Sequence, residues 1–136
     1  MEKIKVLMAD DEKDVLEIMA KKVANEGYDV VTAYDGQDAW EKIQSQSPDV
    51  VILDLTMPRM NGFTVLKNVR EQSSPGKWQP VIIVSALGEL EDVQKGMAEA
   101  DHYLVKPCPV GDIVKAIELM VALIPLRRGA GEEELA

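Results

Sequence analysis

Acidic, hydroxyl and ammonium side chains stand directly after short apolar runs at four places in the chain. They are Asp10 and Asp11, Asp54, Ser85 and Lys106. Three carboxylates in one crevice would repel each other, and proton uptake or a hard divalent cation such as Mg²⁺ relieves this repulsion. A carboxylate beside a metal ion and a lysine is also a nucleophile toward phosphorus, because the cations neutralise charge on the transferred phosphoryl group. If the fold brings these residues together, they form a phosphoryl acceptor.

Five continuous apolar runs indicate the strands that would position these residues. The runs are rich in Val, Ile and Leu and do not alternate with polar residues, which is typical of strands buried on both faces. They cover residues 5–9, 28–33, 50–53, 81–84 and 103–105.

Apolar residues spaced by three and four predict a helix after each strand. The apolar face of the first helix is expected to contain Val15, Ile18, Met19 and Val23, and Gly27 is a candidate left-handed C-cap. The remaining helices are expected to begin at Asp35 or Gly36, to cover about 63–70 and about 90–98, and to start after Asp112 as N-cap.

Five repeats of a strand followed by a helix predict a parallel sheet with right-handed crossovers. We expect an α/β, doubly wound five-stranded parallel sheet in the flavodoxin-like order 2-1-3-4-5, with helices on both faces. Ligands of such sheets bind beyond the carboxyl ends of the strands. In this order the polar residues after strands one, three, four and five surround a single crevice.

Composition and charge limit the class of partner. An apolar share of 46% and a charged share of 29% are close to globular averages, and 136 residues support about one domain. Fifteen Lys and Arg against 24 Asp and Glu give a net charge of −9, which argues against binding nucleic acid or an anionic membrane. With Cys108 as the single cysteine and no signal-peptide or membrane-spanning pattern, we expect a cytoplasmic protein.

The apolar periodicity ends near residue 124. We expect one domain over residues 1–124 and interpret residues 125–136, PLRRGAGEEELA, as a polar C-terminal tail or the start of a linker. Gly62 is expected to allow a positive φ before the third helix.

Four segments resemble, in order and spacing over residues 4–124, the CheY-like receiver domains of two-component response regulators. They are VLMADDEKDV, VVILDLTMPRMNGF, VIIVSA and ADHYLVKP. The resemblance implies that Asp54 accepts a phosphoryl group from a sensor histidine kinase or a histidine phosphotransfer protein. It implies a phosphoacceptor signalling domain that catalyses only its own phosphotransfer and dephosphorylation, and not an enzyme acting on other substrates.

The resemblance also implies roles for the residues around Asp54. Asp11 would bind Mg²⁺ directly, Asp10 would bind it through a water molecule, and the backbone carbonyl of Thr56 would be a further ligand. Lys106 would pair with the phosphoryl oxygens, and Ser85 would turn to donate a hydrogen bond to one of them.

The resemblance further implies a switch, in which movement of Ser85 is coupled to an inward or outward rotamer of Tyr103. This coupling would remodel the surface of the fourth helix, fifth strand and fifth helix. We expect that surface to bind a protein or a second copy of the domain. The Lys106–Pro107 bond is usually cis in such domains. Cys108 replaces a common aromatic residue, so the start of the fifth helix is expected to depart from the usual packing.

Two other interpretations stay open at this point. A degenerate receiver would keep the fold and be regulated by protein contact alone, although this chain retains all five site residues. A flavin-binding protein or a metal-dependent phosphohydrolase would need a glycine-rich phosphate loop after the first strand, or a second Asp shortly after Asp54. Neither pattern is present in the sequence.

Overall fold

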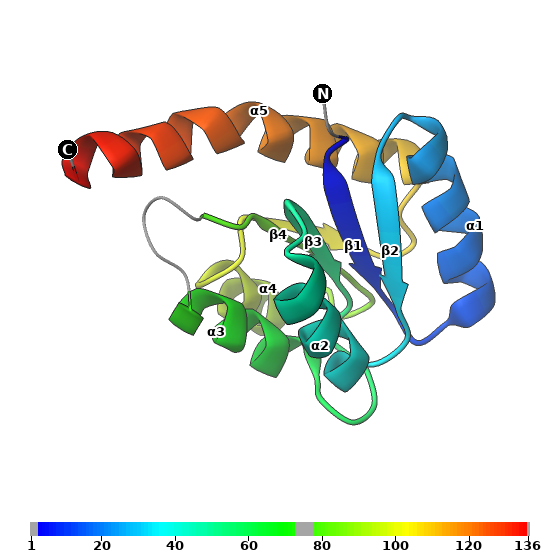
Figure 1. Ribbon diagram of the computed structural model, residues 1–136. Coiled ribbons are helices and arrows are strands. Elements are labelled where there is room, and N and C mark those ends of the chain that lie inside the picture. Colours follow the sequence, from blue (N-terminus) through cyan, green and yellow to red (C-terminus); the bar gives the residue numbers. More distant parts are fainter. Residues whose placement is uncertain (1–2, 73–77, 136) are drawn as a thin grey trace.

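Strands and helices alternate along the chain in the computed structural model, which describes residues 3–72 and 78–135 and, of residues 128–135, the backbone alone (Figure 1). The strands are β1 (Lys5–Ala9), β2 (Asp29–Ala33), β3 (Val50–Leu53), β4 (Val81–Ser85) and β5 (His102–Val105). The helices are α1 (Lys13–Asn25), α2 (Gly36–Gln46), α3 (Gly62–Gln72), α4 (Leu90–Met97) and α5 (Val110–Leu135).

The five strands form one parallel sheet in the order β2-β1-β3-β4-β5, which confirms the expected doubly wound, flavodoxin-like fold. The register places Met8 of β1 between Thr32 of β2 and Ile52 of β3. Leu53 of β3 then pairs with Ile83 of β4. Asp10, Asp11, Asp54 and Lys106 therefore follow strands, and Ser85 ends one, at the same edge of the sheet.

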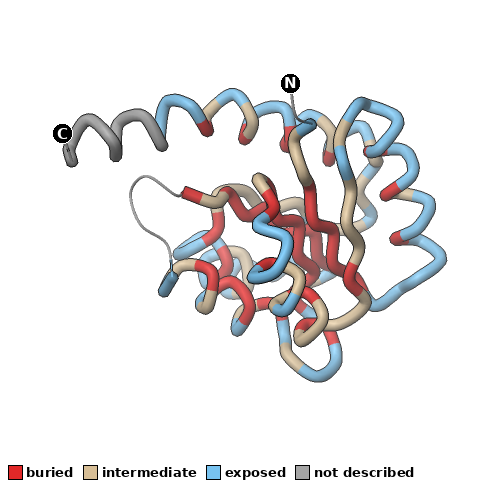
Figure 2. Tube along the Cα trace, viewed as in Figure 1, coloured by how far each residue is buried: buried red, intermediate tan, exposed pale blue. Residues whose placement is uncertain are grey.

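Successive residues of each central strand enter two different cores, which explains why the apolar runs are continuous. On one face, the sheet packs against α1 and α5 through a cluster that includes Val6, Ile52 and Ile117. On the other face, a cluster that includes Leu7 and Ile43 joins the sheet to α2 and α3. Figure 1 shows this sandwich of helices, and Figure 2 shows that the buried residues concentrate in the strands and the inward helix faces.

The predicted apolar face of α1 is wrong in part. Leu16, Ala20 and Val23 face the sheet, whereas Val15 and Ile18 are 45% and 59% exposed. The face of Leu16, Ala20 and Val23 has the same helical period as the predicted face. Periodicity alone does not distinguish the two faces, and contact with the sheet determines which one is buried. The C-cap of α1 is Glu26, and Gly27 is the residue after it. Gly27 has the expected left-handed conformation, with a φ of +100° that an L side chain adopts at a cost.

The start of α5 also differs from the prediction. The helix begins at Val110, and Asp112 lies in its first turn instead of at the N-cap. The carbonyl of Pro109 accepts the amide of Asp112 at 3.0 Å and already closes the first turn. A proline just before the helix has a φ that suits a helix start, and this outweighs the capping preference of an aspartate.

At its other end α5 continues through Pro125 to Leu135, so the loss of apolar periodicity does not mark the end of the helix. It marks the point where the helix leaves the sheet: Ile124 is the last buried apolar residue of α5 among those whose side chains are described, and Leu126 is 69% exposed. Within the described residues, no helix, α5 included, combines the length and apolarity needed to cross a membrane.

Candidate functional site

Backbone hydrogen bonds continue past the strands and position the site residues. The amide of Asp10 donates to the Ala33 carbonyl at 3.1 Å, and the amide of Asp54 donates to the Ala9 carbonyl at 3.1 Å. At the far side, the amide of Lys106 donates to the Ser85 carbonyl at 2.8 Å. These backbone hydrogen bonds to neighbouring strands fix the positions from which the site side chains extend.

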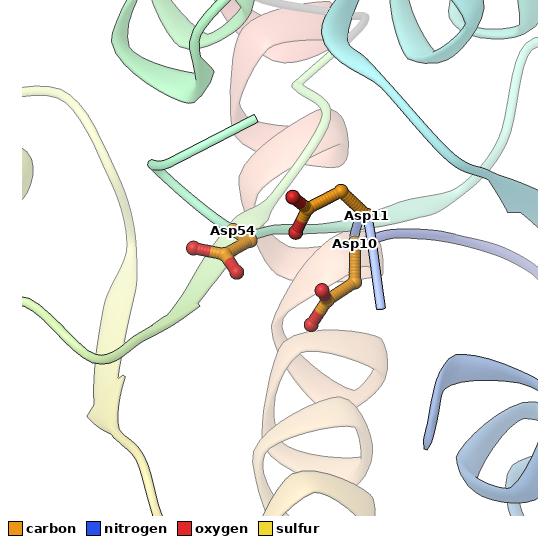
Figure 3. A group of neighbouring side chains, drawn as sticks. All are labelled: Asp10, Asp11 and Asp54. Atoms are coloured by element: carbon orange, nitrogen blue, oxygen red, sulfur yellow. The ribbon is translucent and has the colours of Figure 1, made fainter. Parts of the chain in front are cut away.

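Asp10, Asp11 and Asp54 form an acidic cluster at this edge of the sheet. One carboxylate oxygen from each lies within 4.8 Å of the others. Asp10 and Asp54 are buried and Asp11 is exposed, so the cluster opens to solvent on the side of Asp11. Figure 3 shows the three side chains, with Asp10 and Asp11 on one segment of the chain and Asp54 on the neighbouring segment. Hard oxygen donors at this spacing fit Mg²⁺, which prefers carboxylate and carbonyl ligands and keeps several waters.

Lys106 supplies the positive charge of the site. Its Nζ lies 2.6 Å from an oxygen of Asp10, 3.0 Å from an oxygen of Asp54 and 3.9 Å from Glu12. Burial alone would lower the pKa of Lys106, but the hydrogen bonds to Asp10 and Asp54 outweigh it and the pKa is raised. The ammonium therefore stays charged and partly offsets the repulsion between the two buried carboxylates.

Thr56 holds the other oxygen of Asp54. Its backbone amide donates to Asp54 Oδ1 at 3.1 Å, and its hydroxyl donates to the same atom at 3.3 Å. With Lys106 on Oδ2, both oxygens of the carboxylate have partners and the group has a defined orientation. The family resemblance implied a role only for the Thr56 carbonyl, and no spacing pattern points to its hydroxyl.

Ser85 and Tyr103 stand beside the cluster. Ser85 is fully buried, and its Oγ accepts the amide of Leu87 at 3.3 Å. The hydroxyl of Tyr103 donates to the Leu87 carbonyl at 2.5 Å, so Leu87 is bonded to both residues. Burial and the charge of Asp92 raise the pKa of Tyr103.

The ring of Tyr103 rests on α4 at a glycine. A Cβ added at Gly96 would lie 2.7 Å from Tyr103 Cε2 and 3.0 Å from Ile83 Cδ1. The absence of a side chain at Gly96 therefore lets the tyrosine ring turn inward between α4 and the sheet. In this structure the Tyr103 side chain is half-buried, with its ring against Gly96 and its hydroxyl on the Leu87 carbonyl.

Gly62 has a different role from the expected one. Its φ is not positive, so the left-handed conformation is not the reason for a glycine. A Cβ at Gly62 would lie 2.3 Å from the carbonyl oxygen of Asp54 and 2.7 Å from Leu55 Cα. A glycine is required because the start of α3 passes directly against the backbone that follows β3.

The five residues predicted from the strand ends all meet at this edge, and the cis Lys106–Pro107 bond is confirmed. The histidine and the cysteine do not join them. His102 Nδ1 accepts the amide of Tyr103, and Cys108 Sγ lies 3.6 Å from the Pro109 carbonyl.

The chain is similar in sequence to known response regulators. The family described as response regulator receiver domain matches residues 6–118. The probable transcriptional regulator ycf27 of Guillardia theta is 41% identical over 106 residues, which cover 77% of this chain and 40% of that protein. Response regulator ArlR of Staphylococcus aureus (strain Mu50 / ATCC 700699) is 32% identical over 121 residues, covering 88% and 53%. The chain thus spans about half or less of the length of these relatives.

Solved structures agree as well. The Vibrio cholerae chemotaxis protein CheY4 is 34% identical, with a TM-score of 0.79 and coverage of 88% of this chain and 99% of that one. The receiver domain of the Francisella response regulator 1452 is 32% identical, with a TM-score of 0.77 and coverage of 85% and 94%. The matched family segment contains every residue of the acidic cluster together with Ser85 and Lys106, and on fold and sequence alike the chain belongs to the response regulator receiver domains.

Proposed function

We propose that Asp54 is the phosphoacceptor of this receiver domain and takes its phosphoryl group from a phosphohistidine of a sensor histidine kinase or a histidine phosphotransfer protein. The observation that carries the proposal is the position of Asp54, a buried carboxylate held by Lys106 on one oxygen and by Thr56 on the other. An oxygen of Asp54 attacks phosphorus as the bond from phosphorus to the imidazole nitrogen breaks. The imidazole leaves with the bonding electrons and takes a proton from solvent.

The acidic cluster would hold Mg²⁺ for this reaction. Asp11 and Asp54 would bind it directly, Asp10 through water, and the backbone carbonyl of Thr56 would complete the protein ligands. The bound ion would neutralise charge on the transferred phosphoryl group. The support is the spacing of the three carboxylates and their hard oxygen chemistry.

Lys106 and Ser85 contact the phosphoryl group once it is on Asp54. Lys106 Nζ already contacts Asp54, and when Asp54 becomes an aspartyl phosphate it pairs with a phosphoryl oxygen. The Ser85 hydroxyl turns toward a second phosphoryl oxygen and weakens its bond with the Leu87 amide. The bond from Tyr103 to the Leu87 carbonyl then carries the change to the tyrosine ring.

The output surface of this proposal consists of α4, β5 and α5. Large exposed apolar side chains lie on these elements: Leu90 (72% exposed), Met97 (43%), Val105 (44%) and Leu119 (51%). Apolar exposure favours a protein partner, and a second copy of the domain in an isologous homodimer is one such partner. The net charge of −9 disfavours nucleic acid and membranes as partners of this domain.

The proposal extends to the organisation of the protein. We place the receiver domain at residues 1–124 and interpret residues 125–136 as a polar C-terminal tail or the start of a linker, of which residues 125–135 belong to α5. The protein acts in the cytoplasm, where response regulators generally work, and it transfers the phosphoryl group only to itself.

The test is intact-mass measurement after incubation with acetyl phosphate and Mg²⁺. We expect one phosphoryl adduct on the wild-type chain and none on Asp54→Asn. Asp49→Asn, which removes a carboxylate outside the acidic cluster, is the matched control and should keep the adduct. No adduct on a folded wild-type chain would indicate a degenerate receiver regulated by contact. An adduct that survives Asp54→Asn would place the acceptor elsewhere.

A further inference from the structure

The loop after Asp54 contacts the first residues of α2. We call residues 55–61 the acceptor loop. Its two ends are joined because the Gly62 amide donates to the Leu55 carbonyl at 3.0 Å. Its middle is held from outside, where the Gly36 amide at the start of α2 donates to the Pro58 carbonyl at 3.3 Å.

The middle of the acceptor loop is a strained turn. The Met60 amide donates to the Pro58 carbonyl at 2.8 Å, and Arg59 between them has a φ of +70°. This is a γ-turn, in which the carbonyl of one residue accepts the amide two residues later. Its form with a positive φ at the central residue is rare and strained for a residue with a side chain. Such a turn persists only where its surroundings hold it.

Asp35 and Gly36 provide those surroundings. An oxygen of Asp35 lies 3.6 Å from Arg59 Nη1, while its other oxygen caps α2 by accepting the Asp38 amide at 2.8 Å. A Cβ added at Gly36 would lie 1.5 Å from the Met60 carbonyl oxygen and 2.4 Å from the Met60 carbonyl carbon. The backbone of α2 and the backbone of the loop therefore touch directly, and only a glycine allows it.

Thr56 lies between the two points at which the loop is held. Its amide and hydroxyl bind Asp54, and its carbonyl is the proposed ligand of the metal ion. A shift of the turn at residues 58–60 moves Thr56 relative to Asp54, because only Met57 separates them and that residue is buried and cannot absorb the shift freely. We infer that Asp35 and Gly36 are positioning residues for the phosphoacceptor site, acting through the acceptor loop on Thr56.

The inference rests on the proposed function for its metal ion, but its first readout needs no metal. In the metal-free protein, we expect Gly36→Ala to speed hydrogen exchange of the Thr56 amide and to change its chemical shift. Gly111→Ala is the matched control, since Gly111 is also in the first turn of a helix and a Cβ there meets nothing within 4 Å. It should leave Thr56 unchanged.

The second readout is Mg²⁺ affinity, measured by calorimetry well below the melting temperature. Residues that orient a metal ligand affect affinity strongly, so we expect Gly36→Ala to weaken binding about tenfold and Gly111→Ala to leave it unchanged. Asp35→Asn keeps the helix cap and removes the ion pair with the exposed side chain of Arg59, so about a twofold loss is expected. Asp38→Asn, which removes the same charge from the same helix, controls for net charge.

The outcomes separate the two proposals. If the wild-type chain binds no Mg²⁺, the metal part of the proposed function fails, and the Thr56 amide alone decides the inference. If the wild type binds Mg²⁺ and Gly36→Ala matches it in affinity and in the Thr56 amide, the inference is wrong. A merely structural role would lower the melting temperature of Gly36→Ala and leave both readouts unchanged. Should Gly36→Ala not fold, identical results for Asp35→Asn and Asp38→Asn overturn the inference.

Discussion

The site residues balance three carboxylates against one ammonium. Lys106 contacts Asp10 and Asp54 at once, and Glu12 approaches it from the solvent side. Because its pKa is raised in spite of burial, its charge is present across the physiological range. Addition of a phosphoryl group to Asp54 would replace one negative charge by about two, and the partners of Lys106 would then change. Because Lys106 contacts Asp10 and Asp54 at once, phosphorylation of Asp54 would alter the contacts of several side chains.

Tyr103→Phe is expected to destabilise the protein at neutral pH by about 1 kcal/mol, because the hydrogen bond to the Leu87 carbonyl is lost. The pKa of Tyr103 is raised above 10.0 by burial and by Asp92, so the folded state favours the protonated phenol. This contribution is complete below the unfolded pKa of about 10 and is lost as pH rises through the higher folded pKa.

Urea denaturation of both proteins at about pH 7 and pH 11 measures this effect, with the difference in unfolding free energy shrinking at the higher pH. Tyr34→Phe is the control, because the Tyr34 hydroxyl contacts Glu17 on the surface. Equal stability of wild type and Tyr103→Phe at neutral pH would contradict the proposed importance of the bond to Leu87.

Among the elements, α5 keeps contacts with the domain beyond the point where its apolar periodicity ends. Beyond Pro125 the guanidinium of Arg127 lies over the ring of Trp78, 4.1 Å from its centroid, and 3.5 Å from an oxygen of Asp101. Asp101 also accepts from Arg70 and from the Val81 amide, so it ties the entrance of β4 to α3 and α5. The first turn beyond Pro125 is thus attached to the domain by a cation.

Arg127→Ala in a Trp40→Phe background is expected to uncover the Trp78 ring, which is 8% exposed in the structure. Acrylamide quenching of the remaining tryptophan should increase and its emission should shift to longer wavelength. Loss of the cation–π contact should lower stability by about 0.5–1 kcal/mol. Arg127→Lys keeps the charge and serves as the control. Unchanged quenching in Arg127→Ala would mean that other groups cover the ring.

Elements with one possible burial pattern could be predicted from the sequence, and elements with several could not. Val50 to Leu53 are apolar without interruption, which is typical of a strand buried on both faces. In α1, two faces of helical period compete, and only the sheet decides that Leu16 is buried and Ile18 exposed. Beyond Pro125, α5 contacts the domain through Arg127 and Trp78, residues 49 positions apart, and such a contact leaves no periodic signal.

For the whole molecule, the predicted strand order was sufficient to bring the acidic cluster together. Parallel strands direct their carboxyl ends to one edge, so residue type and strand order together specified Asp10, Asp54, Ser85 and Lys106. The contacts at Gly36, Gly62 and Gly96 could not be predicted in the same way, because each depends on how closely two backbones or a ring approach in the finished fold.

Mg²⁺ is expected to stabilise the folded chain, because only the folded state assembles the acidic cluster. With a Kd of about 1 mM, about 10 mM Mg²⁺ would add roughly 1.4 kcal/mol by linkage. Asp11→Ala should raise the melting temperature of the metal-free protein by removing repulsion, and should abolish most of the gain from Mg²⁺. The measurement is thermal unfolding with and without Mg²⁺ at matched ionic strength. An undiminished Mg²⁺ shift in Asp11→Ala would contradict the assignment of Asp11 as a ligand.

The contact between Lys106 and Asp10 joins residues 96 positions apart, and this separation affects how the protein is made. A ribosome delivers Asp10 and Asp54 long before Lys106, and closing so long a loop costs entropy that only the complete sheet repays. A nascent chain without β5 therefore lacks the ammonium that Asp10 and Asp54 contact in the finished fold. Under the proposed function, a prematurely terminated chain is no competent acceptor, and it does not draw phosphoryl groups away from finished molecules.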